Sequence, residues 1–366
     1  MKYLFYGFIF GSIFLMQFTE ALFAENFIRA DHPFIQYYGR WDRHDSACAK
    51  YSWPGVYLKA EFTGTGIGVR LDDHTNYFNV YIDGSFFSVF HGTQSGKADY
   101  VLAKNLTEGK HTLLLSRRNI TFEEPYSFYG LLLDSTAVIV EPSPKPDRKI
   151  EFIGDSFTVA ESNETKAQSL PWEERYPVTN IDKGFAPVVA RYFHAQYSTI
   201  CRSGAGLVCD WRGDTGGTLP KLFNRTLMEK AEPLWDFKQW IPQVVVVSLG
   251  LNDFSGLKDS SGVVTEKKSE FFRSAYHDFL NVIRAQYPNV KIVALAAYRE
   301  WTRKNTKQVV DEEKAMGKQD VYYATYDEFP GGYVGNGHPT VETHKKMADQ
   351  IIAFMESFRI FPSDLK

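Results

Sequence analysis

The stretch KIEFIGDSFTVAES, residues 149–162, starts as an apolar run and ends in Gly-Asp-Ser. Such a run is typical of a strand buried on both faces of a parallel sheet. Gly-Asp-Ser after a strand makes an ordinary turn, but it can also raise the Ser156 hydroxyl to the rim of the sheet. The other residues that reach this rim decide between a structural turn and a nucleophile.

Two later runs repeat the pattern, VVVVSLG at 244–250 and VKIVALAAY at 290–298. Helix-like stretches occur at 184–196, 267–287 and 340–358. Strands that alternate with helices predict an α/β/α domain with a parallel sheet, assigned here to residues 149–366. Ligands of such domains bind at the carboxyl ends of the strands.

Residues 27–140 have a different texture. GVYLKAEFTGTGIGVRLDD, residues 55–73, alternates apolar and polar residues, and Asp83-Gly84 stands between two apolar runs as a strong hairpin signal. No convincing helix occurs there, so we predict a β-sandwich over residues 25–143. The proline-rich segment PSPKPDRK, residues 142–149, is interpreted as a short stiff linker between the two domains.

The first 24 residues have the pattern of a signal peptide, with Lys2, an apolar run to Phe18 and small residues before a cleavage site after Ala21 or Ala24. An uncleaved anchor is the alternative, because the run is close to the length of a spanning helix. We expect an exported or periplasmic protein, free of the membrane after cleavage. The net charge of −3 gives no basic surplus for nucleic acid.

Three cysteines, Cys48, Cys201 and Cys209, are too few for a disulfide framework and lack zinc-site spacing. Cys201 and Cys209 are close enough in sequence to pair if the loop between them folds back. The sequence leaves both possibilities open.

Four residues at predicted loops of the sheet edge have the chemistry of acyl transfer. Ser156 is a candidate nucleophile, the Gly204 N–H in ICRSGAGLVC a candidate oxyanion donor, and Asn252 in VVVVSLGLND a side-chain donor. His338 in GNGHPTVETHKKMADQ is a candidate base. Each has a structural alternative: a turn at Ser156, a glycine-rich turn at Gly204, a helix cap at Asn252 and a solvated loop at His338.

Taken together, the order Ser, Gly, Asn, His resembles the SGNH hydrolases. The segments at 39–73 and 76–84 resemble the N-terminal jelly roll of carbohydrate esterase family two, and KGFAPVVARYFHAQYSTICRSGAG at 183–206 resembles the helix and second block of that family. The resemblance covers nearly all of the chain after the signal segment. It implies removal of O-acetyl groups from plant polysaccharides such as xylan and glucomannan.

In that mechanism His338 takes the proton of Ser156 and an acetyl-enzyme forms. Ser156 N–H, Gly204 N–H and the Asn252 side chain hold the oxyanion, and neither metal nor cofactor is required. The partner is an acetylated polysaccharide or oligosaccharide. Trp172, Tyr176 and Trp211 are candidates to line the cleft, with packing as the alternative for each.

The pattern departs from the family beside His338. Most SGNH enzymes have an aspartate three residues before the histidine, and some relatives have an acid two residues before it; here these are Gly335 and Asn336. The imidazole must therefore be oriented by a backbone carbonyl, by Asn336 or by a distant acid. Many relatives also have an aromatic residue where Gly337 stands, so one wall of the substrate site differs.

Two alternative functions remain. One is an SGNH esterase for another ester, for which a long apolar lid would be expected in the case of lipid. The other is a carbohydrate-binding protein that kept the fold with little catalysis, which the missing acid favours and the four intact site residues disfavour.

Overall fold

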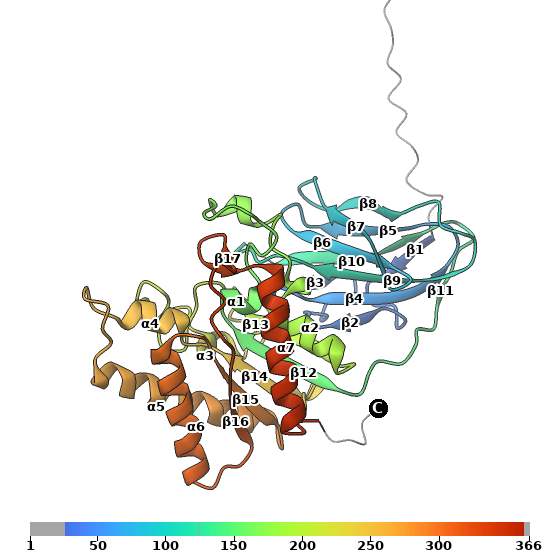
Figure 1. Cartoon of the computed structure of the whole chain (residues 1–366). Helices are drawn as coiled ribbons and strands as arrows, with labels where there is room; N and C mark the ends of the chain where they lie inside the picture. Colours follow the sequence, from blue (N-terminus) through green and yellow to red (C-terminus); the bar gives the residue numbers. More distant parts are fainter. Residues whose placement is uncertain (1–25, 124, 362–366) are drawn as a thin grey trace, which may run out of the picture.

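The computed structural model describes residues 26–361 apart from residue 124. Figure 1 shows a β-sandwich followed by an α/β domain, joined by an extended connection. The strands change from antiparallel to parallel between Val140 and Lys149. The proposed signal segment lies outside the described residues.

The first domain consists of two antiparallel sheets, as the alternating sequence predicted. Along each strand, alternate side chains enter a shared apolar core between the sheets, for example Leu58 and Ala60 from one sheet and Val69 from the other. One sheet contains β1 (Asn26–Arg29), β10 (Tyr126–Leu133), β5 (Ile67–Asp72) and β8 (Ala98–Ala103), with β3 (Ala49–Tyr51) on β10; the other contains β11 (Ile139–Val140), β4 (Tyr57–Thr63), β9 (Lys110–Arg117), β6 (Tyr77–Ile82) and β7 (Ser85–His91), with β2 (Gln36–Tyr38) on β4.

The predicted hairpin is confirmed. β6 and β7 pair antiparallel across Asp83 and Gly84, whose φ angles of 52° and 76° are both positive. A two-residue turn with both φ positive matches the right-handed twist of the strands, which is why Asp-Gly is favoured there.

The second domain has a five-stranded parallel sheet in the order β13-β12-β14-β15-β16. Three strands were predicted and two were missed, because β13 and β16 carry Gln, Ser, Thr and Tyr where the others have unbroken aliphatic runs. The strands are β12 (Lys149–Gly154), β13 (Gln196–Cys201), β14 (Val244–Ser248), β15 (Lys291–Ala296) and β16 (Val321–Thr325).

Helices cover both faces of this sheet. α2 (Phe185–Tyr192) and α7 (Val341–Ser357) pack on one face through Val189 and Met347, and α5 (Glu266–Gln286) and α6 (Glu300–Ala315) lie on the other. The three predicted helices are confirmed as α2, α5 and α7, although α2 ends before the predicted limit and Gln196 already belongs to β13. α6 was missed because its apolar stripe is narrow in a strongly charged sequence. Shorter helices are α1 (Ser156–Val159), α3 (Leu219–Leu222) and α4 (Leu251–Leu257), with 3-10 turns η1 (Glu173–Arg175), η2 (Ile181–Lys183) and η3 (Phe237–Gln239).

The two domains share a packed interface. Tyr38 stacks on Tyr57 with ring centroids 4.3 Å apart, and Tyr57 stacks on Tyr197 of β13 at 4.6 Å. Through this row of stacked rings, the outer face of the sandwich packs against the α/β domain.

A buried ion pair also crosses the interface. Arg40, from the sandwich, lies 3.3 Å from the Glu151 carboxylate on β12 and donates a hydrogen bond of 2.9 Å to the Arg225 carbonyl. Both charged side chains are 1% exposed. Burial raises the pKa of Glu151, and the Arg40 charge and the Tyr287 hydroxyl act in the opposite direction.

The three cysteines are buried and unpaired, so the possible Cys201–Cys209 disulfide is not formed. Within residues 26–123 and 125–361, no helix combines the length and apolar character needed to cross a membrane.

The interface yields a first prediction. Arg40→Leu should lower the free energy of unfolding by about 3–5 kcal/mol, because Glu151 is left buried without its counter-charge. Urea unfolding followed by tryptophan fluorescence measures the change. The double variant Arg40→Leu/Glu151→Leu should recover part of the loss, and a single-variant cost below about 1 kcal/mol would contradict the assigned role of the pair.

Candidate active site

Ser156 directly follows β12 and Asp155 and is the first residue of α1. The Asp155 side chain caps this helix by accepting from the Phe157 N–H at 3.0 Å. Among the described residues, neither the Ser156 N–H nor its hydroxyl has a hydrogen-bond partner. α1 has four residues, so a helix dipole behind Ser156 adds little, and local N–H groups supply the positive potential.

Gly204 and Asn252 follow β13 and β14, the strands on either side of β12. Gly154 is in register with Cys201 of β13 and with Ser248 of β14, so the three strands end at the same level. Gly204 has φ +78°, and its N–H has no acceptor among the described residues. The sheet topology thus brings Ser156, Gly204 and Asn252 to one edge, as predicted.

The Asn252 amide is held in place by the neighbouring loop. Its Nδ2 donates to the Ala205 carbonyl at 2.9 Å, and a second contact to Asp155 Oδ2 is long, at 3.4 Å. One N–H therefore fixes the side chain, and the other is only weakly engaged. A helix cap by the Asn252 side chain, the structural alternative, is not formed, because Gly250 is the N-cap of α4 and has no capping side chain.

Two buried aspartates stabilise the loops around the site. Asp253 accepts hydrogen bonds from the N–H groups of Leu207 and Val208 at 2.9 and 2.7 Å. Burial raises the pKa of Asp253 to about 6, although these donors favour the charged form. Burial also raises the pKa of Asp155 to about 7, and the nearby Asp253 and Glu161 charges add to this shift.

His338 lies in the short strand β18 (His338–Pro339), paired with β17 (Tyr333–Val334). Its Nδ1 is 2.7 Å from the Gly335 carbonyl oxygen, and its ring meets Phe157 edge-on at 6.1 Å. A carbonyl can only accept, so this bond places the proton on Nδ1 and leaves the Nε2 lone pair free to act as a base. His338 is thus close to α1, which starts with Ser156.

The backbone carbonyl was one of three acceptors left open by the sequence, and the Asn336 alternative is wrong. Asn336 Oδ1 accepts from the Leu170 N–H at 2.9 Å, and its Nδ2 donates to Ser169 Oγ at 3.1 Å. Asn336 therefore ties the histidine loop to residues 165–170 and does not bond the imidazole.

The backbone explains why no acid stands at position 335. Gly335 has φ +49°, and a Cβ placed on it would lie 2.3 Å from Ser162 Cβ. A distance this short is a severe overlap between two carbon atoms. The fold therefore excludes an aspartate at 335 unless Ser162 or the loop moves.

A distant acid is also present, and the sequence did not identify it. Glu161 Oε1 lies 3.9 Å from His338 Nδ1, and the Glu161 side chain is 3% exposed. Arg175 Nη1 contacts the same oxygen at 2.6 Å. The only signal was position: Glu161 is the second-last residue of the opening stretch, five residues after Ser156.

The three aromatic candidates divide into one open ring and two packed rings. Trp211 is 56% exposed, and its indole lies where a Cβ on Gly204 would approach within 3.1 Å, so it stands beside the site. Trp172 stacks on Phe122 of the sandwich at 5.1 Å and meets Tyr176 edge-on at 5.9 Å. Packing therefore accounts for Trp172 and Tyr176, whereas Trp211 stays largely exposed, with the Arg212 guanidinium 5.3 Å from the centroid of its ring.

Comparisons with known proteins identify the family. The family model described as carbohydrate esterase 2 N-terminal matches residues 37–143. Cellulase/esterase CelE of Acetivibrio thermocellus is 32% identical over 335 residues, which cover 88% of this chain and 39% of CelE. An acetylxylan esterase / glucomannan deacetylase of Cellvibrio japonicus is 36% identical over 206 residues, which cover 56% of each protein. The structure of a family two carbohydrate esterase from Clostridium thermocellum in complex with cellohexaose superposes with a TM-score of 0.79 at 28% identity, covering 89% of this chain and all of that one.

Residues 37–143 match the N-terminal model of carbohydrate esterase family two, and both domains are similar to a solved structure of that family. The chain spans 39% and 56% of the length of the two curated relatives just named. The family two structure covers both domains, so the pairing of a sandwich with a parallel-sheet domain is common to the two proteins. The resemblance seen in the sequence is therefore confirmed for the family.

The steric exclusion at Gly335 predicts that alanine is tolerated less well at position 335 than at the nearby Gly337. Gly335→Ala should lower the free energy of unfolding by about 1–3 kcal/mol more than Gly337→Ala, because overpacking adds to its backbone cost. Gly337 is the matched control: it has φ +88° but open space around a Cβ. Thermal unfolding of both variants measures the difference, and equal midpoints would show that the Ser162 overlap is relieved without cost.

Proposed function

We propose that this chain is an O-acetyl esterase that removes acetyl groups from plant polysaccharides, with Ser156 as nucleophile and His338 as base. Support comes from the family, whose two Cellvibrio relatives are named acetylxylan esterase / glucomannan deacetylase. The observation that carries the proposal is local: two unpartnered N–H groups, of Ser156 and Gly204, at the sheet edge that also carries an unpartnered hydroxyl among the described residues.

In the first half-reaction Ser156 Oγ attacks the acetyl carbonyl and His338 Nε2 accepts its proton. The Nδ1–H group continues to donate to the Gly335 carbonyl, which keeps the ring in the required tautomer. The carbonyl oxygen becomes an oxyanion that accepts from Ser156 N–H, Gly204 N–H and Asn252 Nδ2. One such donor contributes about 2.7–4 kcal/mol of barrier reduction.

Collapse of the tetrahedral intermediate releases the sugar hydroxyl, which takes the proton from His338. Water then attacks the acetyl-enzyme with His338 again as base, and acetate and free Ser156 are the products. Each step needs a positive imidazolium for a short time, and a carbonyl dipole stabilises that charge less than a carboxylate does.

We assign the missing negative charge to Glu161. Its carboxylate is buried 3.9 Å from Nδ1, which is beyond a hydrogen bond but within strong Coulomb range at low dielectric. Arg175 holds the carboxylate and offsets part of its charge. Glu161 is thus a positioning and electrostatic residue that acts through His338.

The glycan would lie along the exposed part of the Trp211 indole. An exposed indole beside an oxyanion hole provides an apolar platform for a pyranose ring.

Two finer assignments belong to the same proposal. The strand orders β3-β10-β5-β8 and β4-β9-β6-β7 support an eight-stranded jelly roll, to which β1, β2 and β11 add further short strands. The pattern of the first 24 residues supports export to a compartment where polysaccharide is available.

Ser156→Ala should reduce the rate of acetate release from acetylated xylan and acetylated glucomannan at least about 10³-fold relative to the unsubstituted chain. Asn252→Ala should retain the nucleophile and lose about 10²–10³-fold in kcat. Acetate is quantified enzymatically, with circular dichroism as the control for folding. Release by Ser156→Ala at the original rate would overturn the assigned nucleophile, and no release by any form from polymers or an aryl acetate would overturn esterase activity.

Glu161→Gln should lower kcat about tenfold at an unchanged KM, because the imidazolium that forms during the reaction loses a neighbouring negative charge. The amide oxygen can still accept from Arg175, which preserves the local packing. Glu164→Gln is the matched control, since Glu164 is bonded to Arg118 and Lys183 and not to the histidine. An unchanged kcat in Glu161→Gln would contradict the electrostatic role of Glu161.

A further inference from the structure

A cavity lies between the sandwich and the α/β domain, away from the candidate active site. It has a volume of about 510 Å³, which is within the range of small-molecule sites. We name it the linker pocket, because residues 142–146 of the linker form one wall. Ser156, Gly204, Asn252 and His338 are not among its lining residues.

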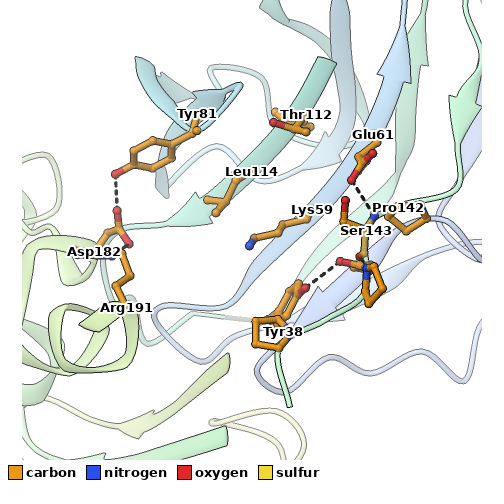
Figure 2. Close-up of a pocket in the computed structure, with 16 residues that line it drawn as sticks. Tyr38, Lys59, Glu61, Tyr81, Thr112, Leu114, Pro142, Ser143, Asp182 and Arg191 are labelled. Atoms are coloured by element: carbon orange, nitrogen blue, oxygen red, sulfur yellow. Dashed lines mark hydrogen bonds and ion pairs between the residues drawn. The ribbon is translucent and has the colours of Figure 1, made fainter. Parts of the chain in front are cut away.

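The linker pocket is built on the outer face of the sheet that contains β4, β9 and β6. Leu58, Ala60 and Phe62 of β4 point into the sandwich core, so Lys59 and Glu61 point outward into the pocket. Figure 2 shows Lys59 running across the pocket, with Leu114 above it and Tyr38 below.

The linker wall is fixed to the sheet. The Ser143 N–H donates to Glu61 Oε1 at 2.7 Å, and Gln36 Nε2 donates to the Ser143 carbonyl at 2.8 Å. Lys145 Nζ donates to the Tyr37 carbonyl at 2.9 Å. The pocket is therefore largely formed without a ligand, which reduces the ordering cost of binding.

In the described part of the chain, two ammonium groups at the linker pocket have no carboxylate partner: Lys145, which donates to the Tyr37 carbonyl, and Lys59, which has no hydrogen bond. Asp182 accepts from the Tyr81 hydroxyl and lies 2.9 Å from Arg191, and Glu61 pairs with Lys110. Lys59 faces no carboxylate within salt-bridge distance among the described residues, and its ammonium group lies over the Tyr38 ring at 5.6 Å. Burial lowers the pKa of Lys59, which reports the cost of this unpaired charge.

A ligand that restores the balance must carry an anionic group to Lys59. The walls beside the ammonium group are apolar, from Leu114 and the linker prolines, while Thr112, Gln36 and Tyr81 bring polar groups to the same space. A pyranose has the same combination of apolar faces and hydroxyl groups.

We propose that the linker pocket binds a carboxylate-bearing sugar residue, a uronic acid of a glycan chain, with Lys59 as the ion-pair partner of the carboxylate. The choice of a glycan rests on the proposed function, whereas the anionic group rests on Lys59 alone. A substrate chain with acidic branches would then be held at two places, the esterase site and the linker pocket.

Isothermal titration calorimetry on the full chain carrying Ser156→Ala tests this without turnover. The probes are a xylo-oligosaccharide with one glucuronic acid branch and the same oligosaccharide without it. We expect the acidic probe to bind at least about tenfold more tightly and its advantage to shrink as salt is added. Equal affinities for the two probes would overturn the proposal.

Lys59→Met keeps the apolar stem and removes the charge, so it should reduce the affinity for the acidic probe at least about tenfold and leave the neutral probe unchanged. Lys59→Arg should retain most of the preference. Unchanged affinity for the acidic probe in Lys59→Met would also overturn the proposal, and free acetate competing as well as glucuronate would overturn its sugar component.

The catalytic readout separates this inference from the proposed function. Lys59→Met in the otherwise unsubstituted chain should hydrolyse an aryl acetate at the original rate, since Lys59 lies outside the active site. Binding of the acidic probe by a chain that releases no acetate would support the linker pocket and overturn the esterase. Acetate release without a preference for the acidic probe would support the esterase and overturn the uronic acid site.

Discussion

The hydrogen bond between His338 Nδ1 and the Gly335 carbonyl, 2.7 Å long, is the interaction on which the site depends. It requires the left-handed turn at Gly335, and that turn is held by the loop at 165–170. Gly335 N–H donates to the Ala167 carbonyl at 2.8 Å, and Asn336 N–H to the Gln168 carbonyl at 2.7 Å. A segment shortly after Ser156 thus orients His338, so the proposed nucleophile and the proposed base share one support.

The domain interface extends this support to the sandwich. Arg118 follows β9 and pairs with Glu164, and its carbonyl accepts from the Ile181 N–H at 3.0 Å. Phe122 stacks on Trp172 from the same side. The sandwich therefore braces the segment that carries Glu161 and Arg175, which gives it a structural part in the chemistry whether or not it contacts glycan.

The sequence predicted the features that depend on local pattern. Apolar runs identified β12, β14 and β15, because a continuous apolar run indicates a buried strand. Asp83-Gly84 identified a hairpin, because these residue types favour the backbone angles of its turn. Placement of Ser156, Gly204 and Asn252 at one edge followed from parallel topology. β13 and α6 were not predicted, because contacts with other elements of the fold bury them and the periodicity of their apolar residues does not show this burial. The sequence did not point to Glu161, because its proposed role depends on its proximity to His338, which lies 177 positions away in the chain.

The overlap of 2.3 Å between Ser162 Cβ and a Cβ at position 335 also limits how this protein can change. A lineage that gains an aspartate at 335 must first make room at 162, and Ser162 itself has φ +56°, where glycine is easily accommodated. The two substitutions are then beneficial in one order and harmful in the other. Such sign epistasis separates carbonyl-oriented histidines from carboxylate-oriented ones by more than a single mutational step, so the two arrangements can persist side by side within one family.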